Sequence, residues 1–421
     1  MIELSATRGY HAVTVTELCS YAGVSPATYY DQFSGKDDCF LAAYRACAEG
    51  VFAPMRAAAT DGDWPGATRQ ALDSLLSALQ EDPDAGRILF IEALGAGAAL
   101  RAERARVLSE FERRIEELLE RTPPEQPTLD VPLMAVVGAL RHIISRHLRT
   151  RTEDQLPALL DDGLLWLSSY VAPGGSVRWS TSPDALLVPA EVPPVAAFSP
   201  ETLPPGTSGL SPSVVARSQR TRLIHATAQV MRVKGYQAAT IADIVGAARV
   251  ARPVFYEHFT DKEGAFLEAQ HHPTQFIIDR CAEAYFSAEQ WPQRIWRHLQ
   301  MLLRLIVENP PLSHLRLVEC YAAGPQAIRR AEGVTRSFGI FLEEGYLHRP
   351  EARALPRLTS QAIAGAIFEI IQRLVAEERW ALLPAHLPQL AYIAIAPFTG
   401  AQEAIELVEE LKGGELVQAP A

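Results

Sequence analysis

The chain has 421 residues, of which 48% are hydrophobic and 21% charged, a globular composition that allows two or more domains and excludes extensive disorder. Its formal net charge of −11 argues against nucleic-acid binding by the chain as a whole, but not by a local basic segment. The five cysteines lack zinc-site spacing, and we find no signal peptide and no long apolar stretch. We therefore expect a cytoplasmic protein with buried free thiols and without membrane, metal or cofactor.

The first predicted elements are three short helices near the N-terminus. Gly9 has the freedom to end a first helix with a left-handed backbone. Thr14 and Glu17 are spaced as a capping box, which predicts the start of a second helix. Ser25, followed by proline, predicts the start of a third. Such a helix, exposed by its first turn, suits the major groove of DNA, so residues 1–44 are interpreted as a helix-turn-helix module.

This module occurs twice in the chain. Residues 14–36 return in altered form, and without a gap, as residues 240–262. Thr240 and Asp243 repeat the capping box of the first copy. An internal duplication of this kind predicts a second helix-turn-helix module at residues 214–270.

A proline-rich segment separates the two copies. Residues 172–213 contain nine prolines and only four charges, without any sustained period, as is typical of a linker. We refer to residues 1–171 as the first repeat and to residues 214–412 as the second repeat.

Each module is followed by sequence that favours helix after helix. The two predicted helical bodies span residues 45–171 and 271–412, with a short tail at 413–421. The duplication continues through them at an offset of 227, at which Gly138 matches Gly365. The sequence therefore predicts an all-α protein built from two tandem units, each a DNA-binding module followed by a helical body.

Charge distinguishes the two modules. Residues 217–262 contain eight basic and three acidic residues, a balance of +5, whereas residues 1–43 contain two basic and five acidic residues, a balance of −3. Because phosphate binding depends on clustered Lys and Arg, the second module has the stronger electrostatic basis for DNA binding.

The apolar positions of the modules predict a small core, and the positions off that face predict the DNA contacts. The predicted core is Val15, Leu18, Ala22, Val24, Tyr29 and Phe33, with Ile241, Ile244, Ala248, Val250, Phe255 and Phe259 in the second copy. The predicted DNA-binding set is Ser25, Pro26, Ala27, Thr28, Tyr29, Tyr30 and Lys36, with Thr240, Arg249, Arg252, Pro253, Val254, Phe255, Tyr256, His258 and Lys262.

The run Gly-Tyr, Thr-x-x-Glu, Ala-Gly-Val-Ser, Thr-Tyr-Tyr, Phe and Ser-x-Lys-Asp in the first module resembles the TetR family of bacterial transcriptional regulators. The resemblance implies a recognition helix that reads a double-stranded operator and a body that binds a small-molecule effector. It also implies dimerisation through the last two long helices of each body, here residues 131–150 with 154–171 and residues 359–380 with 386–398. Because family members usually act as homodimeric repressors, two fused copies imply an intramolecular pseudo-dimer.

Both copies depart from the family pattern. In the second, Arg249 replaces the turn glycine and Ala251 replaces the capping serine, so its recognition helix is expected to be poorly capped. In the first, the counterpart of residues 217–226 is missing. Two interpretations remain open: an asymmetric two-part operator with half-sites about 34 Å apart or a multiple of that, or a sensor or interaction protein with one or both modules degenerate.

The effector is expected to be hydrophobic or aromatic, because the candidate pocket residues lie in apolar helices. Glu92 and Glu319 recur at equivalent positions there, with a buried hydrogen bond to a neighbouring helix as the alternative to ligand binding. No catalytic triad, phosphate loop or dinucleotide motif is found, so we expect no enzyme and no catalytic residue. The candidate ligand-binding residues are Phe90, Glu92, Leu94, Glu319 and Tyr321.

Overall fold

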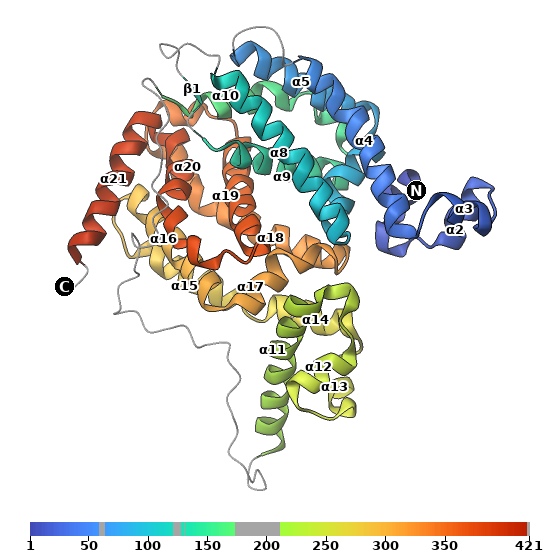
Figure 1. Ribbon diagram of the computed structural model, residues 1–421. Coiled ribbons are helices and arrows are strands. Elements are labelled where there is room, and N and C mark those ends of the chain that lie inside the picture. Colours follow the sequence, from blue (N-terminus) through green and yellow to red (C-terminus); the bar gives the residue numbers. More distant parts are fainter. Residues whose placement is uncertain (59–63, 121–127, 130, 173–210, 419–421) are drawn as a thin grey trace. The chain divides into compact units, whose positions relative to one another are not determined.

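The computed structural model describes residues 1–58, 64–120, 128–129, 131–172 and 211–418. These residues form an all-α fold, as predicted, with one antiparallel ladder between two short strands (Figure 1). Most of the predicted linker, residues 173–210, lies outside the described residues.

The elements of the first repeat begin with the short helices of the DNA-binding module and continue into the body. They are α1 (Ile2–Arg8), η1 (Tyr10–Ala12), α2 (Val15–Ala22), α3 (Pro26–Gln32), α4 (Lys36–Ala58), α5 (Trp64–Glu81), α6 (Pro83–Arg87), η2 (Ile88–Glu92), α7 (Ala93–Gly95), α8 (Ala98–Glu120), β1 (Thr128–Leu129), α9 (Leu133–Thr150), η3 (Glu153–Gln155), α10 (Leu159–Ser168) and β2 (Val171–Ala172).

The second repeat follows the same order, with a longer first helix and a more divided body. Its elements are α11 (Pro212–Ala238), α12 (Ile241–Ala248), α13 (Arg252–His258), α14 (Lys262–His271), α15 (Thr274–Phe286), α16 (Trp291–Glu308), α17 (Pro310–Leu317), η7 (Glu319–Tyr321), α18 (Pro325–Leu342), η8 (Glu343–Leu347), η9 (Glu351–Ala354), α19 (Leu358–Ala376), η10 (Trp380–Leu382), η11 (Pro384–His386), α20 (Leu387–Thr399) and α21 (Ala401–Gln418).

The compact units of the fold do not coincide with the two sequence repeats. Unit 1 comprises Met1–Arg178, Leu342–Ile370 and Ile393–Ile405, and unit 2 comprises Trp179–Phe341, Ile371–Tyr392 and Glu406–Ala421. Unit 1 thus combines the first repeat with parts of the last helices of the second.

Within unit 1, α9 of the first repeat crosses α19 of the second at a pair of glycines. A Cβ atom added to Gly138 would lie 3.1 Å from the Gly365 carbonyl oxygen, and a Cβ added to Gly365 would lie 3.1 Å from the Gly138 carbonyl oxygen. The same added atoms would meet the Cβ of Glu369 at 2.3 Å and the Cβ of His142 at 2.6 Å. Both glycines are therefore needed for this close approach. The contact is reciprocal, since 138 and 365, like 142 and 369, are counterparts at the offset of 227.

The buried end of α10 makes a second contact of this kind. The Tyr170 hydroxyl donates to the carbonyl oxygen of Ile393 at 2.8 Å, and both residues belong to unit 1. The Trp166 ring, also buried, donates its indole N–H to the Tyr170 hydroxyl at 3.3 Å. These contacts fall on the helices in which the family resemblance placed dimerisation.

The core of the second module is more complete than that of the first. In the second, Ala248 is only 4% exposed, and Leu223 and Ile224 of α11 are buried with it. In the first, the helix that precedes the capping box is α1, residues Ile2–Arg8. Ala22 and Val24 are exposed there, so their predicted place in the core is wrong.

The helical region of residues 83–95 in the first body is not one continuous helix. It is divided at η2, one turn of π-helix that leads to Glu92. The second repeat is divided at the equivalent place by η7, which begins at Glu319. Both breaks bring a carboxylate to the joint between the body and its DNA-binding module.

One described segment, Trp380–Thr399, is long and apolar enough to cross a membrane. Within its most apolar window 72% is buried inside the structure, as in the core helix of a globular fold. All five cysteines are buried and unpaired by disulfides, as predicted.

Candidate nucleic-acid interface

The second module presents a cationic recognition helix. Its capping box is formed, with the Asp243 N–H donating to the Thr240 hydroxyl at 3.2 Å. Arg249 ends α12 in the left-handed conformation, with φ of 52°. As predicted, Ala251 at the N-cap of α13 provides no side-chain cap. The strained turn is supported by Arg222, whose guanidinium donates to the Arg249 carbonyl oxygen at 2.8 Å. The turn therefore holds an exposed arginine directly before the recognition helix.

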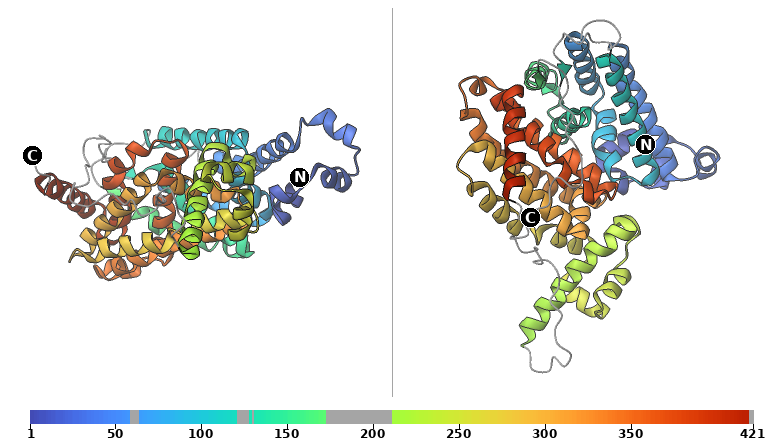
Figure 2. Two further views of the ribbon diagram at one scale, coloured as in Figure 1. Left: turned by 90° about the horizontal axis from the view of Figure 1, so that it is seen from below. Right: turned by 60° about the vertical axis from the view of Figure 1, so that its left-hand side comes forward.

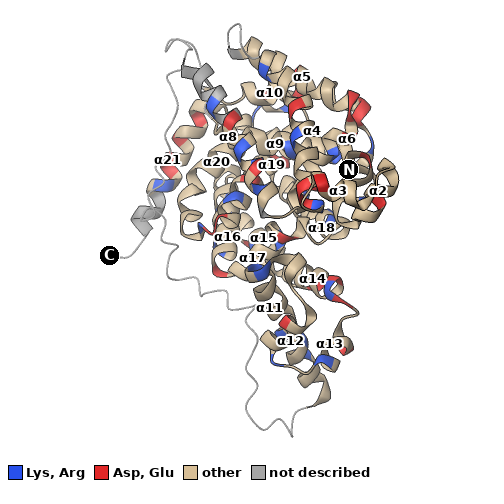
Figure 3. Ribbon diagram, turned by 45° about the vertical axis from the view of Figure 1, so that its right-hand side comes forward, with Lys and Arg blue, Asp and Glu red and all other residues tan. Residues whose placement is uncertain are grey.

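Arg252 and Tyr256 form an ordered pair on the exposed face of α13. The guanidinium lies 5.9 Å from the centre of the Tyr256 ring, and its Nη2 donates to the Tyr256 hydroxyl at 3.4 Å. One helical turn separates the two residues, so they share one face of the helix. Arginine presents parallel N–H groups that match the edge of guanine, and this pair places them on the surface that faces outward. Figure 3 marks the Lys and Arg residues along α11–α14, and the views of Figure 2 keep these helices (green to yellow) together.

The first module presents a polar recognition helix without a basic residue. Ser25 caps α3 by accepting a hydrogen bond from the Thr28 N–H at 3.1 Å. Tyr30 is 58% exposed, and Asp31 beside it is exposed as well. Any DNA contact of this helix therefore depends on hydroxyl and aromatic groups.

The predicted DNA-binding residues divide by burial. Tyr29 and Phe255 are buried, at 5% and 0% exposure, and their predicted contact with DNA is wrong because both pack in the cores of their modules. Val254, His258, Lys36 and Lys262 are half-buried. The exposed members are Ser25, Pro26, Ala27, Thr28, Tyr30, Thr240, Arg249, Arg252, Pro253 and Tyr256.

The two lysines bind the protein's own backbone. Lys262 Nζ donates to the carbonyl oxygens of Tyr236 at 2.7 Å and Ala239 at 3.0 Å, and it lies 4.5 Å from the centre of the Tyr236 ring. Lys36 makes the equivalent contacts with Tyr10 and Val13 at 3.2 and 3.1 Å. Burial lowers the pKa of both ammonium groups. Each lysine thus ties the turn before the second helix of its module to the start of the next long helix.

A carboxylate from the body closes the joint behind each module. The Tyr10 N–H donates to Glu92 at 2.7 Å, and the Tyr236 N–H donates to Glu319 at 2.6 Å. The preceding residue is glycine with positive φ in both copies, 84° at Gly9 and 76° at Gly235. Burial raises the pKa of Glu92. The contacts of Glu92 and Glu319 are those of the predicted alternative, a buried hydrogen bond to a neighbouring element.

A second hydrogen bond accompanies each carboxylate. His11 Nε2 lies 2.9 Å from the Gly95 carbonyl oxygen, and Gln237 Nε2 donates to the Ala322 carbonyl oxygen at 3.0 Å. These residues are again counterparts. These two hydrogen bonds between module and body therefore recur in both copies.

Comparison with known proteins identifies the modules. The family described as "Bacterial regulatory proteins, tetR family" matches residues 2–43 and residues 223–269. Both modules belong to the TetR family. Its two matches coincide with the two helix-turn-helix modules, so the family unit occurs in tandem. Members of this family are transcription regulators and not enzymes.

The chain has relatives of low identity. It is 20% identical over 155 residues to the HTH-type transcriptional activator FasR of Mycolicibacterium smegmatis, a match that covers 37% of this chain and 59% of the relative. Two solved structures are similar over 41% of this chain and 96% of their own: the fatty acid degradation regulator FadR from Bacillus halodurans, at 19% identity and a TM-score of 0.38, and the regulator FadR from Bacillus subtilis in complex with stearoyl-CoA, at 14% and 0.37.

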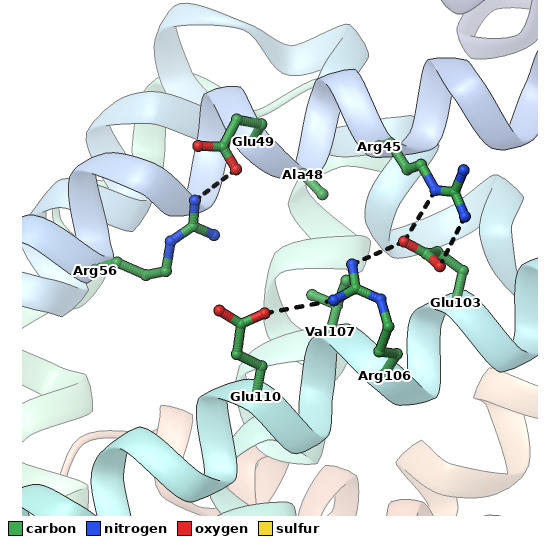
Figure 4. A pocket seen from close by; sticks show the side chains of 8 residues that line it. All are labelled: Arg45, Ala48, Glu49, Arg56, Glu103, Arg106, Val107 and Glu110. Atoms are coloured by element: carbon green, nitrogen blue, oxygen red, sulfur yellow. Dashed lines mark hydrogen bonds and ion pairs between the residues drawn. The ribbon is translucent and has the colours of Figure 1, made fainter.

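The body of the regulator's first repeat contains an open groove of about 620 Å³ between α4 and α8 (Figure 4). Glu103, with a side chain 8% exposed, accepts hydrogen bonds from Arg45 at 3.1 and 3.2 Å and from Arg106 at 2.9 Å. These bonds hold the pKa of Glu103 at about 2, with the Arg106 hydrogen bond as the largest cause. The lining residues are Arg45, Ala48, Glu49, Arg56, Glu103, Arg106, Val107 and Glu110.

The sequence did not indicate this groove in the regulator. None of the predicted ligand-binding residues lines it, and Phe90 packs instead against the core of the first body. The signal available was the spacing of Glu103, Arg106 and Glu110 on one face of α8, which is also typical of a solvated helix surface. Among the described residues, no group of three His, Cys, Asp or Glu is arranged to hold a metal ion.

Proposed function

We propose that this chain is a ligand-responsive repressor that binds a two-part operator as a single-chain pseudo-dimer. The observation that carries the proposal is the reciprocal contact of Gly138 and Gly365. A two-fold interface brings the same surface of both partners together, so that counterpart residues meet each other. Here the counterparts lie in one polypeptide. This supports the proposal that the two repeats pair with each other in the way that the two subunits of a family homodimer do.

The operator is proposed to be asymmetric. The second recognition helix offers Arg252 and Tyr256, whereas the first offers Thr28 and Tyr30. Since arginine reads guanine and uncharged side chains favour other contacts, the half-sites differ in sequence. The second module supplies most of the phosphate attraction, and hence most of the salt dependence.

The ligand is proposed to enter the groove between α4 and α8. Helix α4 runs without interruption from Lys36, at the edge of the module, to Ala58 in the body. A ligand that moves α4 relative to α8 therefore also moves the module, because one helix joins the groove to the module. The hydrogen bond of Glu92 to Tyr10 is a second connection between the body and the module. The exposed guanidinium groups of Arg45 and Arg106 favour a ligand with an anionic group, and Ala48 and Val107 favour an apolar part next to it.

A second candidate function is a sensor in which the first module no longer reads DNA. It is favoured by the exposure of Ala22 and Val24 and by the acidic balance of residues 1–43. In that case the second module alone binds DNA, and the first serves as a scaffold.

DNA selection from a random pool with the full chain tests the proposal. We expect an enriched site with two unequal halves, whose affinity falls on Tyr30→Ala in one half and on Arg252→Ala in the other. Sensitivity to Arg252→Ala alone supports the sensor with one active module. A perfect palindrome, or no enriched site, contradicts the two-part operator.

A further inference from the structure

We propose that a buried ion triad, Arg104–Glu369–Arg141, makes the pairing of the repeats selective, so that the first repeat pairs with a second repeat and neither pairs with another copy of itself. The inference rests on the proposed pseudo-dimer. It specifies which repeat can pair with which at the proposed interface.

In the triad, both oxygens of the Glu369 carboxylate contact an arginine. Arg141 donates to Glu369 Oε2 from Nε at 2.7 Å, and its Nη2 lies 2.6 Å from the same oxygen. Arg104 Nη2 donates to the other oxygen, Oε1, at 3.2 Å. The side chains of Glu369, Arg141 and Arg104 are 7%, 10% and 21% exposed, so the carboxylate meets its two cations largely away from water. All three residues belong to unit 1.

The side chain of Glu369 begins at the helix crossing itself. The Glu369 Cβ is the atom that an added Cβ on Gly138 would meet at 2.3 Å. From this point the carboxylate of Glu369 reaches Arg141 of α9. The charge of Glu369 is therefore part of the contact surface between the repeats.

The charges of the triad are not repeated in the sequence. At the offset of 227, the counterpart of Glu369 is His142, that of Arg141 is Phe368 and that of Arg104 is Ala331. The first repeat thus supplies only the cations of this site, and the second supplies only the anion.

Pairing of like repeats would leave these charges uncompensated. Two second repeats would bring each Glu369 to Phe368 and Ala331 of the other, where no cation meets it. Two first repeats would bring Arg141 and Arg104 together without the carboxylate. A charge buried without its partner strongly disfavours a complex, so both like pairings are opposed by the same three residues.

The glycine crossing does not provide this selectivity. Because Gly138 and Gly365 are counterparts, every combination of repeats retains a glycine on both sides. The exposed hydrogen bond of Arg146 to Gln361, at 2.7 Å, also joins the repeats, but exposed polar contacts discriminate weakly. Selectivity therefore depends on the triad.

Reversal of the charges in the full chain tests the proposal. One variant carries Glu369→Arg, a second carries Arg104→Glu with Arg141→Glu, and a third carries all three substitutions. We expect the first two to have a lower thermal midpoint than the wild type, because like charges meet inside each chain. The third should recover most of the loss.

The decisive sample is an equal mixture of the first two variants. Each chain offers the surface that the other lacks, so native mass spectrometry should detect complexes with one copy of each variant, and the thermal midpoint should rise. Two differently tagged wild-type chains, mixed in the same way, give the background. Recovery in the triple variant without mixed complexes would mean that the triad only stabilises the fold, and it would overturn the selectivity. Mismatched variants as stable as the wild type would overturn it as well.

Glu369→Gln provides a variant that keeps the size of the side chain. We expect a lower thermal midpoint and a concentration-dependent rise in mass, since second repeats can then pair with each other. Wild-type mass and stability would contradict the proposal.

A cross-linking experiment tests separately whether the two repeats pair within one chain. Arg146→Cys with Gln361→Cys, treated with a short bis-maleimide, should give an intramolecular cross-link that neither single cysteine gives. Absence of the cross-link refutes the pseudo-dimer. A cross-link together with unaffected charge variants refutes only the selectivity.

Discussion

The backbone N–H of Tyr236 donates to the carboxylate of Glu319 at 2.6 Å, directly after the glycine that ends the straight part of α11. Tyr10 and Glu92 repeat this bond in the other copy. A carboxylate that accepts a backbone N–H holds it more strongly than a neutral acceptor does. The bond therefore fixes the angle at which each module leaves its body, and a change in the body that moves the carboxylate also moves the module.

The first prediction concerns this joint. Glu319→Ala should lower the free energy of unfolding by about 1 to 3 kcal/mol, because the Tyr236 N–H loses its acceptor. It should also reduce the difference in DNA affinity between the ligand-free and ligand-bound protein. Thermal unfolding and DNA titration measure the two effects. Glu289→Ala, at an exposed position in the same repeat, is the matched control and should change neither.

The second prediction is that Lys262 contributes mainly to stability, whereas Arg252 contributes mainly to recognition of the DNA sequence. Lys262→Met should destabilise the protein by about 1.5 to 3 kcal/mol, because three carbonyl oxygens lose a charged donor. It should weaken binding to all DNA sequences alike.

Arg252→Ala should leave stability within about 0.5 kcal/mol, since the side chain is exposed. It should cost about 1 to 3 kcal/mol in affinity, at one base pair of the selected site. Unfolding curves and titrations against single-base variants of that site distinguish the two residues. Equal loss of stability in both variants would contradict the division of roles.

The local elements could be predicted from the sequence, because their signals lie within one or two turns. Thr14 with Glu17 and Thr240 with Asp243 form capping boxes at the predicted positions. The predicted left-handed glycine has a positive φ at Gly9. Arg249 shows that a backbone conformation can persist after its glycine is replaced, when a distant side chain such as Arg222 holds the turn.

The site was harder to predict, because its contacts join residues far apart in the chain. Lys36 and Lys262 have the composition of phosphate ligands, and only the fold shows that carbonyl oxygens surround them. Glu369 cannot be recognised from the repeat, because its counterpart at the offset of 227 is a histidine, His142. Its signal was a single acidic residue within the apolar run of α19.

The third prediction concerns the helix crossing. Gly138→Ala and Gly365→Ala should each destabilise the protein by about 1 to 3 kcal/mol, because the new methyl group overlaps the facing helix. Gly333→Ala in α18 is the control, since an added Cβ there meets nothing within 4 Å. It should be neutral or stabilising by up to about 1 kcal/mol. Chemical denaturation of the three variants measures these changes in the free energy of unfolding. Equal changes at all three sites would contradict the close approach of α9 and α19.

The last prediction concerns pH. The attraction of Arg141 and Arg104 outweighs the effect of burial and lowers the pKa of Glu369 from its ordinary value of 4.5 to about 2. A carboxyl group with a lowered pKa in the folded state stabilises the fold above its ordinary pKa and loses that contribution as the pH falls toward the folded value. Between pH 5 and pH 2 the wild type should therefore lose more stability than Glu369→Gln, which has no proton to bind at this site. Thermal midpoints measured for both proteins across that range provide the comparison. Parallel curves would mean that the carboxylate is not held by its two arginines in solution.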